Sequence, residues 1–108
     1  MKLGDLIARL EEQNPALVLP VGWSSPHSYR DYYECVAFEH RSNVTVGECL
    51  AAAREALGST YQGWKGGDYD MNEWTDCYLV IEEGMTGEEI TPTMLELDIA
   101  AGARSGAR

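Results

Sequence analysis

Apolar residues recur with helical spacing near both ends of the chain. Positions 3, 6, 7 and 10 are apolar and fall on one helical face, which predicts a helix over residues 3–13 that ends at Asn14-Pro15. Near the other end, Thr91-Pro92 has the form of an N-cap followed by proline at the first helical position. We expect a helix from there to about Ala101, followed by a disordered tail over residues 102–108.

A third helical pattern lies in the middle of the chain. Apolar residues recur on one face from Val46 to Leu57, and Thr45 and Glu48 have the spacing of a capping box, in which each side chain satisfies a backbone donor of the other residue. We expect this helix to stop at Gly58, because glycine readily takes the left-handed conformation that follows a helix.

Alternation with a period of two predicts strands in three places. Leu17–Val21 is a short apolar run interrupted by a proline, which favours an edge strand or the end of a strand. Tyr33–His40 and Thr75–Glu82 are longer runs that alternate. The two faces of these longer runs are Val36 and Phe38 against Cys35 and Ala37, and Cys77, Leu79 and Ile81 against Tyr78 and Val80.

The segments between these runs are rich in turn-forming residues. Gly22–Tyr32 has no periodicity and contains many polar side chains, so we expect a loop there. Arg41–Asn43 predicts a turn, and Glu83–Glu89 an acidic loop.

A glycine pair marks a predicted hairpin after the central helix. Ser59–Lys65 alternates as a strand, Gly66-Gly67 suits a two-residue turn, and Asp68–Met71 returns as the second strand. In that register Lys65 faces Asp68 across the turn.

Together these elements predict one α+β domain over residues 1–101. The order helix, strand, strand, helix, hairpin, strand, helix contains too few crossover units for a doubly wound sheet. We therefore expect a small antiparallel or mixed sheet of four to five strands, with two to three helices packed on one face.

The charge distribution limits the kinds of partner. The net charge is -10, and residues 66–102 hold ten acidic residues and no Lys or Arg. Because such a surface repels phosphate backbones, direct binding of nucleic acid is disfavoured. The segment is either a solvated face that keeps the protein soluble or a patch that meets a basic protein or a cation.

Cysteine and histidine usage gives no covalent or metal chemistry. The three cysteines form neither an even disulfide set nor a zinc pair, and each lies in an apolar neighbourhood typical of a small buried residue. The two histidines have no partners at ligand spacing. We predict no metal, no cofactor and no catalytic residue. The first apolar stretch contains charged residues, which argues against a signal peptide, and no apolar run is long enough for a membrane span. We therefore expect a reduced, cytosolic protein.

Two segments could bind a ligand. The first is the polar stretch after Gly22, in which Arg30 can hold a phosphate or carboxylate with two parallel hydrogen bonds. The alternative is that Arg30 pairs with Asp31 or Glu34 while the hydroxyls satisfy loop backbone. The candidate binding residues of this segment are Ser25, His27, Ser28, Tyr29 and Arg30.

The second segment is the predicted hairpin, where aromatic rings offer stacking surfaces, glycines allow close approach and Lys65 adds a cation. Aromatic residues at strand spacing are also typical of core and cross-strand pairs. The candidate binding residues here are Tyr61, Trp64, Lys65, Gly66, Gly67 and Tyr69. The phosphate-loop spacing is absent around Gly66-Gly67.

Three stretches carry a family resemblance: PHSYR at Pro26–Arg30, NVTVG at Asn43–Gly47 and YQGWKGG at Tyr61–Gly67. With these, residues 17–79 resemble small proteins encoded by tailed bacteriophages, especially those of actinobacteria, and by their prophages. The resemblance implies a setting, a phage accessory protein in the host bacterial cytoplasm, and carries over no catalytic residue. After Leu79 the chain departs from the family pattern in an acidic segment.

Two functional hypotheses follow. In the first, the protein binds a small anionic, nucleotide-like ligand without turnover and sequesters a host defence signal. In the second, its acidic segment inhibits or engages a basic host protein that handles nucleic acid. An enzyme acting on a nucleotide is a third alternative, for which the sequence offers no catalytic group. An edge strand and many aromatic residues are compatible with a homodimer.

Overall fold

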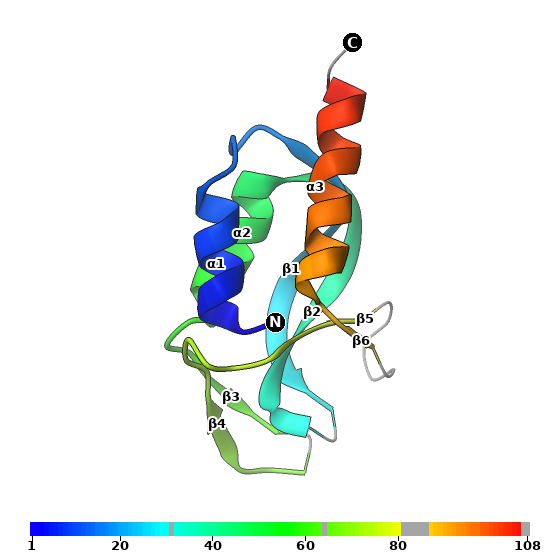
Figure 1. Cartoon of the computed structure of the whole chain (residues 1–108). Coiled ribbons are helices and arrows are strands. Elements are labelled where there is room, and N and C mark those ends of the chain that lie inside the picture. The colour runs from blue at the N-terminus through cyan, green and yellow to red at the C-terminus, as the bar shows by residue number, and fades with distance from the viewer. Residues whose placement is uncertain (31, 64, 81–86, 107–108) are drawn as a thin grey trace.

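The computed structural model describes residues 1–30, 32–63, 65–80 and 87–106 of the chain. The helices stand together beside a four-stranded mixed sheet, and a two-stranded hairpin extends from one end of the molecule (Figure 1). This confirms the predicted α+β class. The helices are α1 (Leu3–Glu11), α2 (Val46–Ala56) and α3 (Pro92–Gly106).

The larger sheet has the order β1-β2-β5-β6 and is mixed. β1 pairs antiparallel with β2, β2 parallel with β5, and β5 antiparallel with β6. The chain between β2 and β5 forms α2 and the separate β3-β4 hairpin. The strands are β1 (Val18–Tyr29), β2 (Tyr32–Thr45), β3 (Thr60–Gln62), β4 (Asp68–Asp70), β5 (Cys77–Val80) and β6 (Glu88–Glu89).

The two faces of the larger sheet differ in what packs on them. Val36, Phe38 and Cys77 belong to the main core, together with the apolar faces of all three helices. We call this side the inner face. Cys35, Ala37 and Val80 join a smaller cluster built from strand residues, on the side that we call the outer face. The predicted alternation of β2 and β5 is confirmed at the described residues, while Ile81 lies outside them.

The prediction of a loop over Gly22–Tyr32 is wrong, because this segment continues β1 and pairs with β2 almost to its end. Trp23 contributes to this outcome: it is 2% exposed, and its indole N–H donates to the carbonyl of Cys49 at 3.1 Å. The turn-forming residues are accommodated by a β-bulge between Ser24 and His27, where Ser25 has a φ of 48°. The predicted turn at Arg41–Asn43 is likewise part of β2.

The helix signals in the first half of the chain are confirmed, with small differences in length. α1 ends at Glu11, two residues before the predicted end, and its first free donors bond to the 73–75 backbone. The capping box of α2 is formed, because Glu48 N–H donates to Thr45 Oγ1 at 3.2 Å and Thr45 N–H to the Glu48 carboxylate at 3.1 Å. α2 ends at Ala56, and Gly58 has the expected positive φ of 81°.

α3 extends beyond its predicted end. Thr91 Oγ1 accepts the N–H of Met94 at 3.2 Å, as the N-cap pattern indicated, but the helix continues through Gly106 and not only to Ala101. The expectation of a disordered tail from Gly102 is therefore wrong over 102–106, while residues 107–108 lie outside the described residues. The reason is tertiary: Gly102 is buried against β1, where a Cβ would lie 2.2 Å from the carbonyl oxygen of Val18.

The β3-β4 hairpin has a longer turn than predicted. Gln62 pairs with Asp68, so the connection runs from Gly63 to Gly67, and the two-residue Gly66-Gly67 turn with Lys65 opposite Asp68 is wrong. Gly63 N–H donates to the carbonyl of Gly67 at 2.9 Å, and Gly66 N–H to the carbonyl of Gly63 at 3.0 Å. These hydrogen bonds lie within a connection that is longer than the predicted two-residue turn.

The acidic stretch after β5 also contains a short strand. Glu88 and Glu89 form β6 against β5, where we expected the end of a loop. The predicted strand Thr75–Glu82 corresponds to β5 over Cys77–Val80. Residues 81–86 lie outside the described residues.

Candidate functional site

The first predicted binding segment forms the end of β1 and the turn into β2. Ser28 Oγ donates to the carbonyl of Tyr33, which ties the end of β1 to the start of β2. His27 Nδ1 lies 3.0 Å from the carbonyl of Ser28 and donates to it in the tautomer protonated at that nitrogen. Arg30 is exposed in the turn between Tyr29 and Tyr32, whose backbones pair. Ser25 is exposed in the β-bulge, away from this turn.

Strand geometry divides these residues between the two faces of the sheet. His27 pairs with Ala37 and therefore shares the outer face, where Tyr29 also lies. Ser28 pairs with Val36, whose side chain belongs to the main core. The five candidates of the polar segment therefore do not form one contiguous surface.

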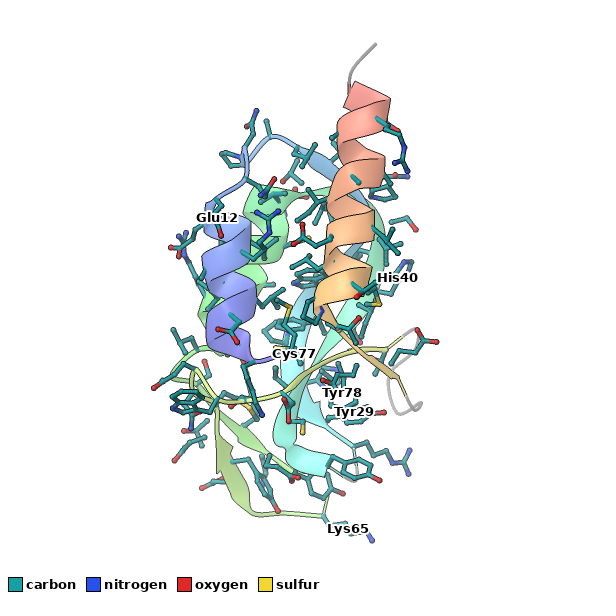
Figure 2. The ribbon with its side chains drawn as sticks, viewed as in Figure 1. Glu12, Tyr29, His40, Lys65, Cys77 and Tyr78 are labelled. Carbon is teal, nitrogen blue, oxygen red and sulfur yellow. The ribbon has the colours of Figure 1, made fainter. Side chains whose placement is uncertain are left out.

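The second predicted segment contacts the start of β2. The rings of Tyr33 and Tyr69 have centroids 5.4 Å apart at an interplanar angle of 37°. Gly63 lies at the same place, because a Cβ there would be 2.9 Å from the Tyr69 ring and 3.2 Å from the Tyr33 ring. We call the contact among Ser28, Tyr33, Gly63 and Tyr69 the hairpin junction. It brings the end of β1 and the β3-β4 hairpin to the same end of the molecule (Figure 2).

Among the described residues, three buried polar atoms of the segments that form this junction have no hydrogen-bond partner. They are His27 Nε2, Tyr33 Oη and Tyr61 Oη. Tyr61 pairs directly with Tyr69 across the β3-β4 hairpin, and burial raises the pKa of its hydroxyl. Buried polar groups in folded proteins nearly always have hydrogen-bond partners, so these three atoms stand out among the described residues.

The remaining hairpin candidates lie at its tip. Lys65 is exposed there, as Figure 2 shows, and Gly66 and Gly67 have φ values of 93° and 85°. Trp64 lies outside the described residues. The tip therefore provides one cation next to the aromatic residues of the junction.

An aromatic stack on the outer face was not predicted as a site. The ring centroids of Tyr29 and Tyr78 are 4.4 Å apart, and the ring planes differ by 11°. The centroids of Tyr29 and Tyr32 are 5.9 Å apart, with planes that differ by 18°. The Tyr29 hydroxyl accepts the N–H of Gly87 at 2.7 Å. Tyr78 could have been found from the alternation of β5, but its proximity to Tyr29 depends on the pairing of β2 with β5, which the sequence does not reveal.

The cysteines are buried and free, as expected from their neighbourhoods. Burial raises the pKa of the Cys35 and Cys49 thiols to about 11 and that of Cys77 to about 12. Thiols with such pKa values are protonated at neutral pH and are poor nucleophiles. Across the described ranges, no group of three His, Cys, Asp or Glu side chains is placed to hold a metal ion.

Several acidic residues of the 66–102 segment pair with the first residues of the chain. The N-terminal ammonium lies 2.7 Å from the Glu89 carboxylate, Lys2 Nζ 2.9 Å from Asp76, and Arg9 Nε 2.6 Å from Glu96. The Arg9 hydrogen bond lowers the pKa of Glu96, and the Asp76 hydrogen bond raises that of Lys2. These carboxylates therefore form ion pairs within the chain. The segment offers less unpaired negative charge to a partner than its composition indicated.

None of the protein-family models, characterised proteins or solved structures compared with this chain matches it. In the part of the chain that the structure describes, no helix has the length and apolar character needed to cross a membrane.

Proposed function

We propose that this protein binds a small anionic, nucleotide-like ligand at the hairpin junction, without turning it over. One observation carries the proposal: Tyr33, whose carbonyl accepts a hydrogen bond from the Ser28 hydroxyl, contacts Tyr69, and this links the polar segment to the hairpin. If these segments lay far apart, the proposal would lose its main support.

The groups around the junction have complementary roles in such binding. Tyr33, Tyr61 and Tyr69 supply aromatic faces for a base or sugar. Lys65 at the hairpin tip and Arg30 in the β1-β2 turn would meet the anionic groups.

The described groups around the junction offer no catalytic pair, which favours binding over turnover. The cysteine thiols are protonated at neutral pH, as described above, and none of the groups around the junction forms a nucleophile and base pair among the described hydrogen bonds. In the setting that the phage resemblance implies, a binding protein of this kind would sequester a host signal made of nucleotides.

The competing hypothesis of an acidic inhibitor receives less support. Glu89, Asp76 and Glu96 are held in ion pairs with residues of the same chain. A basic partner would have to displace these pairs, which reduces the charge that the segment offers.

The test is calorimetric titration of the purified chain with a panel of mono-, di- and cyclic nucleotides, each beside its uncharged nucleoside. We expect nucleotides to bind more tightly than nucleosides. Lys65→Gln should weaken nucleotide binding by about tenfold, the usual worth of a charged hydrogen bond. Arg104→Gln, which removes one exposed cation from α3, is the matched control and should have no effect. Binding to no member of the panel would overturn the proposal.

A further inference from the structure

A groove lies between β1 and α3 and shares no residue with the hairpin junction. It has a volume of about 420 Å³ and is lined by residues of β1, β5, β6, α3 and Ile90. Its walls are apolar and include Trp23, Ile90 and Leu95. Val21 and Leu97 line it while 40% and 67% exposed, so the groove opens to solvent beside large apolar side chains.

A single carboxylate is buried in this apolar lining. Asp98 of α3 is only 8% exposed, and its Oδ1 accepts the backbone N–H of Val21 at 2.9 Å. Among the described residues this is the hydrogen bond that the carboxylate makes, so Oδ2 remains as an acceptor. Burying a carboxylate in apolar surroundings is costly unless a charged or polar partner offsets it.

The charges around the groove favour a cation. Asp98 and the exposed Glu88 both line it, and the residues lining it include no Lys, Arg or His. His40 of β2, which pairs with Trp23, interacts with Asp98 electrostatically without forming an ion pair among those described. Burial raises the pKa of Asp98, which the Val21 N–H and His40 partly oppose. A hydrogen-bond donor that carries a positive charge would stabilise the ionised carboxylate more than the Val21 N–H or His40 does.

We propose that this groove binds a small apolar ligand that carries one ammonium group. The ammonium pairs with Asp98, and the hydrocarbon part packs against Trp23 and Leu95. The site is separate from the one proposed above and has the opposite charge preference, so failure of either proposal leaves the other standing.

The experiment compares two ligands of the same shape, 2-phenylethylamine and 2-phenylethanol, at neutral pH. Binding is followed by the amide shift of Val21 and the indole N–H shift of Trp23 in heteronuclear NMR spectra. We expect the amine to bind more tightly than the alcohol. Asp98→Asn keeps an acceptor for Val21 but removes the charge, and should weaken amine binding by at least about tenfold. It should leave alcohol binding unchanged.

Two further variants keep the test decisive. Ala101→Leu fills the groove from α3 without changing its charge and should weaken both ligands, which covers the case in which Asp98→Asn does not fold. Glu73→Gln removes an exposed carboxylate outside the groove and should change neither affinity. Equal affinity for amine and alcohol, or amine binding that survives Asp98→Asn or Ala101→Leu, would overturn the proposal. Failure of both ligands to bind would do the same.

Discussion

Tyr33 and Tyr69 lie with ring centroids 5.4 Å apart, although 36 positions of sequence separate them. This contact fastens the β3-β4 hairpin to the start of β2. The close approach depends on Gly63, because a Cβ at that position would meet both rings and the carbonyl of Gly66 at 2.9 to 3.2 Å.

Gly63→Ala should therefore loosen the junction. We expect a loss of about 1–3 kcal/mol in the free energy of unfolding, because the added methyl group has no room between backbone and rings. Gly66→Ala is the comparison: its Cβ would meet no atom of the described residues within 4 Å, so the positive φ of 93° is what opposes it, at a cost of about 1 kcal/mol. Urea denaturation of both variants measures the difference. A smaller loss for Gly63→Ala than for Gly66→Ala would contradict the steric account.

The buried hydroxyl of Tyr61 gives a second prediction. Since this hydroxyl makes no hydrogen bond of ordinary geometry among the described residues, Tyr61→Phe should leave the unfolding free energy unchanged or raise it by up to about 1 kcal/mol. Tyr29→Phe is a matched variant that removes a hydroxyl bonded to the Gly87 N–H at 2.7 Å, and should cost about 1 kcal/mol. If Tyr61→Phe destabilises the protein as much as Tyr29→Phe does, its hydroxyl has a partner, such as an ordered water.

Asp98 gives a prediction about pH. Its folded-state pKa is raised, chiefly by burial, so the folded chain holds this proton more tightly than the unfolded chain. The contribution of this group to stability is therefore fully present below its unfolded pKa and is lost as the pH rises through the folded pKa. Asp98→Asn removes this dependence while keeping an acceptor for Val21. We expect its stability relative to the natural chain to be higher at pH 7 than at pH 4, in urea denaturation at both values.

Glu96 provides the control of opposite sign for that experiment. Its hydrogen bond from Arg9 lowers its pKa, so its contribution is present above the unfolded pKa and is lost as the pH falls through the folded pKa. Glu96→Gln should accordingly lose stability relative to the natural chain at pH 7 more than at pH 4. The same direction of change in both variants would contradict the assignment of Asp98.

The packing of α3 on β1 gives a fourth prediction. Gly102→Ala would place a Cβ 2.2 Å from the carbonyl oxygen of Val18, against a strand that cannot yield as a flexible side chain does. We expect a loss of more than about 1 kcal/mol in unfolding free energy despite the better helix propensity of alanine. Ser105→Ala, at an exposed position of the same helix, should be neutral or slightly stabilising. Thermal unfolding followed by circular dichroism compares the two, and equal melting temperatures would show that α3 does not depend on close approach at Gly102.

The sequence determined the parts of this protein that depend on neighbours along the chain. The caps at Thr45 and Thr91 were predicted because their partners lie three residues away, within one helical turn. The alternating faces of β2 and β5 were predicted because side chains point to opposite sides of any strand. These signals also led to the α+β class.

Tertiary structure alone decided what the polar segment and the tail became. Residues 22–29 have the composition of a loop, yet they form a strand because β2 satisfies their backbone groups and the core buries Trp23. Residues 102–106 continue α3 because β1 lies against Gly102. The candidate site has the same origin, since the meeting of Tyr33 with Tyr69 is a long-range contact that no local pattern encodes.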